Sequence, residues 1–179
     1  MNYRRAYIQN SFVHIVIASY NRIPVFIDNI EILRTAFKNT MSNYKFEIIA
    51  ICVLPDHIHL ILNPENINEY PKIISSVKYY FSRNVGQVCP TYTELALGYK
   101  NKREKGIFQR RFYEHTILNE DELNRNIDYV HFNPVKHGYV KSVKDWEYSS
   151  FHKFVKNNLY DINWGSEENI LNIKDLNVE

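Results

Sequence analysis

The chain has few of the features that mark secreted or membrane proteins. Its 179 residues include only two cysteines, Cys52 and Cys89, which are too few for a framework of disulfides. No apolar run approaches the roughly 20 residues that a membrane-spanning helix needs. The first ten residues, MNYRRAYIQN, carry charge but no apolar stretch of the kind that secretory signals contain. These absences predict a protein of the reducing cytoplasm with no membrane partner.

The composition is that of one ordinary globular domain. Hydrophobic residues make up 45% of the chain and charged residues 23%, and no internal repeat or low-complexity linker interrupts it. The net charge is only +2, but residues 161–179 hold five acidic side chains and one lysine, so the remainder carries about +6. A basic body is compatible with a polyanionic partner but does not establish one. We expect residues 1–155 to form the domain and residues 156–179 to form a tail packed on it or trailing from it.

Hydrophobic periodicity and turn signals predict seven elements. The predicted strands are 12–20, 46–54, 57–63 and 112–118, and the predicted helices are 28–42, 71–86 and 120–133. The order of the first six elements, β-α-β-β-α-β, matches the ferredoxin-like split βαβ pattern. We therefore predict an α+β fold in which helices cover one face of an antiparallel sheet and the last helix is an addition.

Three local signals set the expected helix ends. Asp28 is a plausible N-cap of the first helix, and Asn119 with Glu122 resembles a capping box at the start of the last helix. Pro134 is expected to end that last helix just past Asn133, because proline breaks helical hydrogen bonding.

Two histidines interrupt the apolar stretch VLPDHIHLILNP at residues 53–64. Side chains two residues apart on a strand point the same way, so His57 and His59 share one face, with Cβ atoms roughly 7 Å apart. The apolar residues Ile58, Leu60 and Leu62 share the other face. Two imidazoles that project together suit two ligands of one metal ion.

Three interpretations of this histidine pair compete. The first is a pair of hydrogen-bonded structural histidines. The second is a histidine-triad nucleotide hydrolase, but that class needs a third histidine at position 61, where this chain has Ile61. The third is a metal site completed by a residue from another element.

The last helix offers residues that could complete such a site. At 100° per residue, Leu123, Ile127 and Val130 form its apolar stripe. Tyr129 and Asn133 lie one turn apart on a different stripe, where the amide oxygen is a potential ligand and the phenol oxygen a potential nucleophile. The alternative for Tyr129 is an aromatic packing residue. Glu122 shares the stripe, but capping the helix would account for it.

Taken together, these segments resemble a known family. LPDHIHLIL resembles the HUH motif (His, hydrophobic, His) of single-tyrosine transposases, and YVHFNPVKHGYV (129–140) resembles a characteristic segment of the REP-associated tyrosine transposases. NYRRA (2–6), FQRRFYEHTILNEDEL (108–123) and DWEYSSFHKF (145–154) also stand where that family leads us to expect them. The chain departs from the family at IQNSFVHI and at Phe108, where tryptophan is frequent.

The resemblance implies both a reaction and a set of site residues. His57, His59 and Asn133 would hold one divalent cation, Mg²⁺ or Mn²⁺. Tyr129 would attack a scissile phosphate to give a 5′-phosphotyrosine and a free 3′-OH. The implied protein is a metal-dependent single-stranded DNA endonuclease and strand transferase. Its expected partner is single-stranded DNA with imperfect palindromes, of the REP hairpin type, in the nucleoid. It would act as a monomer, or as a homodimer with exchanged catalytic helices.

Binding of DNA is expected from two basic segments. The run KNKREKGIFQRR (100–111) contributes Lys102, Arg103, Lys105, Arg110 and Arg111, and a second pair is Arg4 and Arg5. The alternative for a charge run is solvated surface. Two other function classes stay open: a non-catalytic nucleic-acid-binding protein on the same fold, and a metal-binding protein of unrelated function. His14 is expected to pack or hydrogen-bond locally.

Overall fold

A computed structural model of the chain describes residues 7–88 and 107–165. Its elements are β1 (Phe12–Ala18), η1 (Tyr20–Arg22), α1 (Ile30–Met41), β2 (Phe46–Val53), β3 (His57–Pro64), η2 (Ile67–Glu69), α2 (Tyr70–Val88), β4 (Tyr113–Ile117), α4 (Glu120–Lys136), η3 (Val143–Asp145) and α5 (Phe151–Lys156). The four strands form one sheet in the order β2-β3-β1-β4, and every neighbouring pair is antiparallel. This topology confirms the predicted ferredoxin-like α+β fold.

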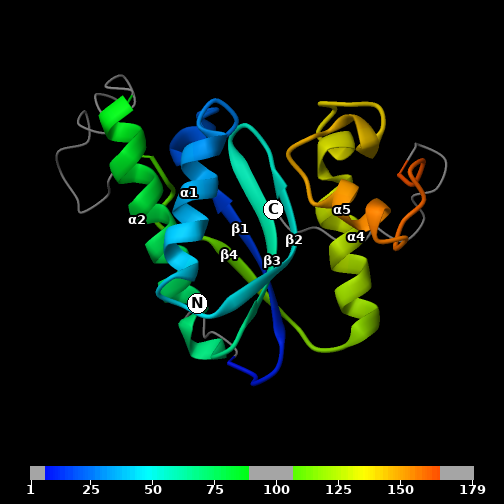
Figure 1. The fold of residues 1–179 in the computed structure, drawn as a ribbon, viewed down its shortest axis with the longest axis horizontal. Helices are drawn as coiled ribbons and strands as arrows, with labels where there is room; N and C mark the ends of the chain where they lie inside the picture. The colour runs from blue at the N-terminus through cyan, green and yellow to red at the C-terminus, as the bar shows by residue number, and fades with distance from the viewer. Residues whose placement is uncertain (1–6, 89–106, 166–179) are drawn as a thin grey trace.

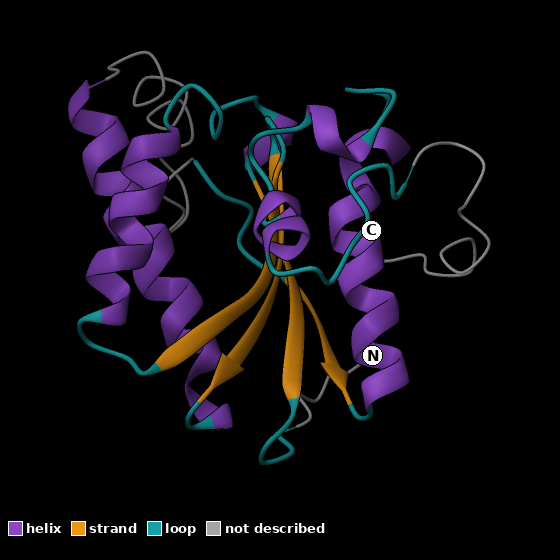
Figure 2. Ribbon diagram, turned by 45° about the vertical axis from the view of Figure 1, so that its right-hand side comes forward, coloured by secondary structure: helices purple, strands orange, loops and turns teal. Residues whose placement is uncertain are grey.

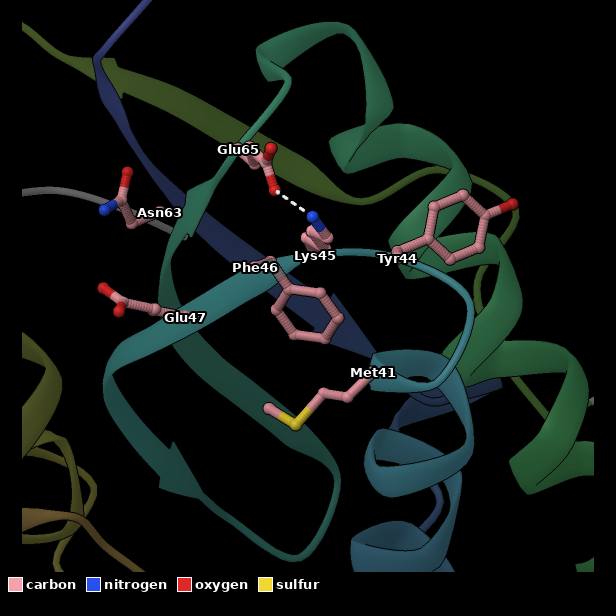
Figure 3. Close-up of a pocket in the computed structure, with 7 residues that line it drawn as sticks. All are labelled: Met41, Tyr44, Lys45, Phe46, Glu47, Asn63 and Glu65. Carbon is pink, nitrogen blue, oxygen red and sulfur yellow. Dashed lines mark ion pairs between the residues drawn. The ribbon is translucent and has the colours of Figure 1, made fainter.

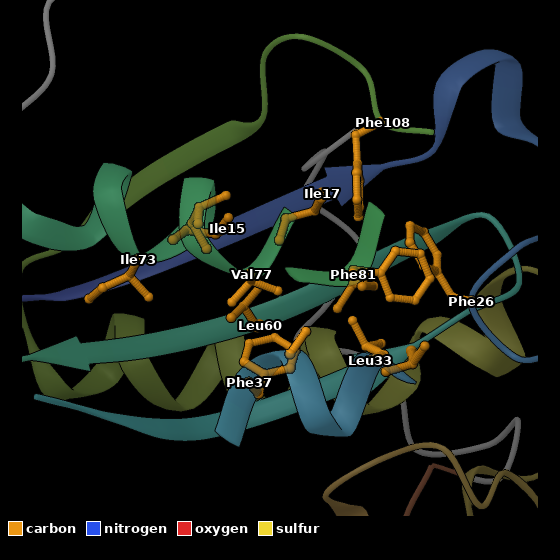
Figure 4. Close-up of a cluster of buried hydrophobic side chains, with 14 of the residues drawn as sticks. Ile15, Ile17, Phe26, Leu33, Phe37, Leu60, Ile73, Val77, Phe81 and Phe108 are labelled. Atoms are coloured by element: carbon orange, nitrogen blue, oxygen red, sulfur yellow. The ribbon is translucent and has the colours of Figure 1, made fainter. Parts of the chain in front are cut away.

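The sheet separates two layers of helices. Helices α1 and α2 cover one face, and α4 lies on the opposite side (Figures 1 and 2). The larger core fills the space between the sheet and the helix pair, where alternate residues of β1 and β3 meet the apolar stripes of α1 and α2 (Figure 4). Its labelled members are Ile15, Ile17, Phe26, Leu33, Phe37, Leu60, Ile73, Val77, Phe81 and Phe108.

A smaller apolar layer attaches α4 to the other face of the sheet. Ile127 and Val130 of α4 are buried there against Ala50, Ile61 and Ile117 of the strands, with Leu123 partly buried beside them. The predicted apolar stripe of the last helix is therefore confirmed. Because this layer covers the second face of β3, that strand is buried on both sides.

The segment before α5 protects the outer edge of β2. The backbone N–H of Val53 donates to the carbonyl of Tyr148, and the N–H of Ser150 donates to the carbonyl of Ile51, each over 2.8 Å. These bonds satisfy backbone groups of the edge strand that would otherwise be unpaired.

After α5, the ring of Tyr160 stacks on Trp164 with 4.6 Å between centroids. None of the helices among the described residues is both long enough and apolar enough to cross a membrane.

The expected cap of the first helix is wrong by one residue. Helix α1 follows Asn29 rather than Asp28, and the Asn29 side chain donates from Nδ2 to the carbonyl of Val25 over 2.9 Å instead of capping the helix. The predicted cap of the last helix is confirmed, because Oδ1 of Asn119 accepts from the N–H of Glu122 over 2.8 Å.

The expectation that Pro134 ends the last helix is also wrong. Helix α4 continues to Lys136, and the chain leaves it at Gly138, which has a φ of +72°. There, the N–H groups of Gly138 and Tyr139 donate to the carbonyls of Val135 and Pro134, which is the hydrogen-bond pattern of a Schellman cap. Every residue from Asn126 to Pro134 except Asp128 is buried, and this packing stabilises the helix past its proline. One further turn of helix therefore follows Asn133.

Candidate active site

The histidine pair lies at one end of the sheet, on the face that α4 covers. His57 is opposite Ala18 of β1 and His59 is opposite Val16, and the two histidines are 1% and 0% exposed. Their neighbours Ile58 and Leu60 belong to the core under α1 and α2. The predicted division of β3 into a histidine face and an apolar face is confirmed.

Helix α4 brings a row of polar side chains to these histidines. Tyr129, Asn133 and the C-cap residue His137 are spaced four residues apart, so they lie along one face of the helix. The ring of Tyr129 is 5.6 Å from that of His59, and the ring of His137 is 4.9 Å from that of His57, between centroids. Asn133, one turn from each, lies between these two contacts.

A third histidine joins the pair. His57, His59 and His137 each offer a ring nitrogen, and these nitrogens all lie within 4.8 Å of one another. His137 was not among the residues predicted from the sequence. The signal that could have identified it is its spacing of four from Asn133, which the expected helix end at Pro134 obscured.

Three buried polar atoms at this site have no hydrogen-bond partner in the part of the chain that the structure describes: Nε2 of His57, Nε2 of His59 and Oδ1 of Asn133. The orientation of the Asn133 amide follows from its other end, where Nδ2 donates to the carbonyl of Tyr129 over 2.7 Å. Buried polar atoms in proteins are nearly always satisfied. Hydrogen-bonded structural histidines would not leave both Nε2 atoms unpaired. Two imidazole nitrogens and one amide oxygen are a donor set that fits a divalent cation.

The ring of His57 is held from behind by a carboxylate. Nδ1 of His57 is 2.7 Å from Oδ1 of Asp56, and the other carboxylate oxygen is 3.3 Å from Nη1 of Arg22. Burial raises the pKa of Asp56, but the hydrogen bond and the charges of His57 and Arg22 outweigh it and keep the pKa below its ordinary value. Metal-binding histidines commonly donate their second ring N–H to a carboxylate in this way, which aims Nε2 at the ion.

His59 is held on its far side by another imidazole. Its Nδ1 is 3.4 Å from Nε2 of His14, whose own Nδ1 is 2.7 Å from Oδ1 of Asn126 on α4. His14 therefore bonds across the fold rather than locally, contrary to the expectation for it. Burial lowers the pKa of His59 well below its usual range, and the nearby charges of other histidines and Lys136 lower it further. A histidine must be neutral to bind a metal, so this environment favours the ligand form.

The phenol oxygen of Tyr129 has a cationic partner. Tyr129 is 1% exposed, and Nζ of Lys136 donates to its oxygen over 2.8 Å. Lys136 was not predicted from the sequence. A second tyrosine, Tyr113 on β4, lies nearby: its ring is 6.5 Å from that of His14, and it is 40% exposed. Burial raises the pKa of Tyr113, and the neighbouring Tyr129 raises it further.

Glu122 is occupied by structural contacts. One carboxylate oxygen is 2.7 Å from Nε2 of His115, and the other accepts from the N–H of Leu118 over 2.7 Å. Burial raises the pKa of Glu122, but these hydrogen bonds outweigh it and lower the pKa overall. Its contacts match the capping role that the sequence offered as the alternative to a catalytic one.

The structure describes two of the seven predicted DNA-binding residues. Arg110 and Arg111 are exposed and follow Gln109, whose N–H donates to the carbonyl of Ala18 over 3.0 Å. Since Ala18 pairs with His57, these arginines leave the sheet at its histidine end. The other predicted residues lie outside the described part of the chain: Arg4, Arg5, Lys102, Arg103 and Lys105.

A separate hollow lies at the other end of the β2–β3 hairpin (Figure 3). It has a volume of about 490 Å³ and is lined by Met41, Tyr44, Lys45, Phe46, Glu47, Asn63 and Glu65. Nζ of Lys45 and Oε2 of Glu65 pair across it at 3.6 Å. None of these lining residues belongs to the histidine site, so the chemistry is not expected there.

Comparison with known proteins places this chain in a family. The family model described as "Transposase IS200 like" matches residues 7–133. A candidate REP-associated tyrosine transposase of Haemophilus influenzae is 42% identical over 171 residues, which cover 94% of this chain and 96% of that protein. The REP-associated tyrosine transposase of Escherichia coli is 34% identical over 167 residues, 92% of this chain and 91% of that one.

A solved structure supports the same assignment. A REP-associated tyrosine transposase bound to a REP hairpin superimposes with a TM-score of 0.81 at 30% identity, covering 99% of this chain and 96% of that one. Sequence and fold thus agree over nearly the whole length. The chain belongs to the IS200-like transposases, and within them to the REP-associated tyrosine transposases.

Proposed function

We propose that this protein is a metal-dependent endonuclease and strand transferase acting on single-stranded DNA, with Tyr129 as its nucleophile. The observation that carries the proposal is a cluster of three buried potential ligand atoms, from His57, His59 and Asn133, beside the tyrosine. None of the three has a hydrogen-bond partner within residues 7–88 and 107–165. Leaving such atoms unpaired costs about 1–3 kcal/mol each, so a ligand that satisfies all three is expected.

A divalent cation, Mg²⁺ or Mn²⁺, fits this donor set. His57, His59 and Asn133 would hold it, and His137 stands close enough to the histidine pair to contribute a further nitrogen. When bound, such an ion polarises a phosphate and stabilises the charge that develops in phosphoryl transfer. Asp56 and His14 would keep the two strand imidazoles oriented toward it.

The chain's own residues then account for the transfer step. The phenol oxygen of Tyr129 forms a bond to the scissile phosphorus while the bond from phosphorus to the 3′ oxygen breaks. The phenol proton is released, and the departing 3′ oxygen takes up a proton to become a 3′-OH. One phosphodiester replaces another, so rejoining by a DNA 3′-OH needs no external energy source. Lys136 would stabilise negative charge on the attacking oxygen through the hydrogen bond it already makes.

The DNA would carry an imperfect palindrome that forms a hairpin. The solved relative is bound to a REP hairpin, and the curated relatives are named for the same class of element. Arg110 and Arg111, exposed at the histidine end of the sheet, would contact its phosphates. The remaining predicted contacts, from Arg4, Arg5, Lys102, Arg103 and Lys105, stay part of this proposal.

The rival function is a hairpin-binding protein that has lost catalysis. Incubation with a hairpin oligonucleotide taken from DNA beside the gene, with Mn²⁺ or with EDTA, separates the two. The proposed enzyme gives a cut strand and a covalent protein–DNA adduct on denaturing gels only with Mn²⁺, whereas a binder gives a mobility shift and neither product. Binding without an adduct across a set of such hairpins would overturn the catalytic proposal.

A further inference from the structure

A series of hydrogen bonds between buried side chains runs from helix α4 to Nδ1 of His59. It consists of Asn126, His14 and His59, all of which are fully buried. The series begins at the backbone carbonyl of Glu122, which can only accept a hydrogen bond. The direction of every later hydrogen bond can therefore be worked out in turn.

The first step fixes the amide of Asn126. Its Nδ2 donates to the carbonyl of Glu122 over 2.8 Å, so the other end of the amide is the oxygen. That oxygen, Oδ1, lies 2.7 Å from Nδ1 of His14. Because an amide oxygen only accepts, Nδ1 of His14 must carry the proton.

The second step fixes His14. The ring is fully buried, and it bonds to a neutral amide and to another imidazole, so a charged ring would be a buried charge without a counter-charge. The ring is therefore neutral and has a single N–H. With the proton on Nδ1, its Nε2 presents a lone pair. That lone pair faces Nδ1 of His59 at 3.4 Å.

The third step fixes His59. With a proton on Nδ1, the ring donates to His14 and its buried Nε2 presents a lone pair to the metal site. The opposite tautomer would set two lone pairs against each other. Nε2 of His59 lacks a partner among the described residues in either form, so the contact with His14 decides between them. Loss of that hydrogen bond costs free energy, so the Nδ1–H form is the stable one.

We propose that Asn126 and His14 are positioning residues that hold His59 in the Nδ1–H tautomer, ready to bind a divalent cation through Nε2 before any ion arrives. This inference rests on the proposed metal site, and it assigns a role to two residues that act through His59. In His57, the same task falls to the carboxylate of Asp56. The two strand ligands are thus oriented by different means.

The tautomer can be measured directly in the metal-free protein. Nitrogen-15 NMR of the histidine rings distinguishes a protonated Nδ1 from a protonated Nε2. We expect His59 to be Nδ1–H in the wild type, and His14→Phe to shift it toward the Nε2–H form. An Nε2–H form of His59 in the wild type would overturn the inference, whether or not the protein cleaves DNA.

Titration with Mn²⁺ gives a second readout. His14→Phe should weaken Mn²⁺ binding by about 10- to 100-fold, the usual loss when a residue behind a metal ligand is removed. His14→Gln should restore most of the affinity, because its amide oxygen can accept from His59 while its amide nitrogen donates to Asn126. Asn126→Leu, which removes the first side chain of this hydrogen-bonded series, provides a second test if His14→Phe does not fold.

The matched control is His131→Phe. It also removes a buried histidine, but this one lies on α4 and its Nε2 bonds to Ser150 rather than to the site. We expect wild-type Mn²⁺ affinity in this variant. Affinity equal to wild type in folded His14→Phe or Asn126→Leu would overturn the inference. Absence of Mn²⁺ binding in the wild type would overturn the proposed metal site instead, and the NMR result would then still decide the tautomer.

Discussion

Nζ of Lys136 lies 2.8 Å from the phenol oxygen of Tyr129 and 4.9 Å from the centre of its ring. The two residues are seven positions apart, which is two turns along one helix face. The cation therefore sits beside the oxygen that is proposed to attack DNA. It belongs to the turn of α4 that follows Pro134.

The first prediction tests Lys136. Lys136→Met should slow cleavage by about 10- to 100-fold, because a hydrogen bond from a charged group contributes roughly 1.5–3 kcal/mol where charge develops. Hairpin affinity should change little. Single-turnover cleavage at saturating protein measures the effect, and Lys141→Met, at an exposed position after the helix, serves as the control. Equal rates for the two variants would remove Lys136 from the mechanism.

The second prediction separates the two tyrosines near the site. Tyr129→Phe should fold, bind metal and bind the hairpin, but form no covalent adduct, because only the attacking oxygen is lost. Tyr113→Phe should still form the adduct, since it is the ring of Tyr129 that lies 5.6 Å from that of His59. Peptide mapping of the wild-type adduct identifies the modified residue. A phosphotyrosine at position 113 would refute the assignment of Tyr129.

Much of this arrangement could be predicted from sequence, because it depends on short periodicities. Alternation on β3 placed His57 and His59 on one face, and helical spacing placed Tyr129 one turn before Asn133. The order of strands and helices was sufficient for the ferredoxin-like topology. These features depend on neighbours within a few residues, so no knowledge of packing is needed to find them.

The parts that were missed depend on tertiary packing. Proline was expected to end α4, but the burial of its residues stabilises the helix beyond Pro134. Because the helix continues, Lys136 and His137 lie at the site. His14 and Asn126 are 112 positions apart. No local pattern signals their contact, which arises only when α4 docks on the sheet.

The third prediction concerns the metal. His57→Ala or His59→Ala should abolish cleavage and weaken Mn²⁺ binding, while hairpin affinity stays within a few-fold of wild type, because phosphate contacts dominate affinity for DNA. His152→Ala, which changes an exposed histidine on α5, should behave as wild type in both assays. Full cleavage by a His57→Ala, His59→Ala double variant in EDTA would rule out the proposed metal site.

The fourth prediction is a pH dependence of stability. Burial lowers the pKa of His131 to about 3 from its ordinary 6.5. Below pH 6.5 the unfolded state binds the proton and the folded state does not, so stability is lost as the pH falls from 6.5 toward 3. Between pH 7 and pH 5, this one group should contribute a loss of about 2 kcal/mol. Urea unfolding of metal-free His131→Phe should therefore show a smaller loss than wild type over that interval, and an equal loss would contradict the assignment.

The last prediction asks whether one chain is sufficient for one active site. In this structure α4 packs against β2 and β3 of its own chain, and only Leu118 and Asn119 separate it from β4. The Tyr129 and His59 rings that lie 5.6 Å apart therefore come from the same molecule.

If the catalytic helix were exchanged in a dimer, mixing Tyr129→Phe with His59→Ala would create some sites with both native residues. With the site formed in one chain, every molecule in that mixture lacks one of them. We expect equimolar mixtures, incubated long enough for subunits to exchange, to give no adduct, while wild type mixed with His59→Ala gives adduct in proportion to the wild type present. Recovery of cleavage in the first mixture would show instead that the helix is exchanged between subunits.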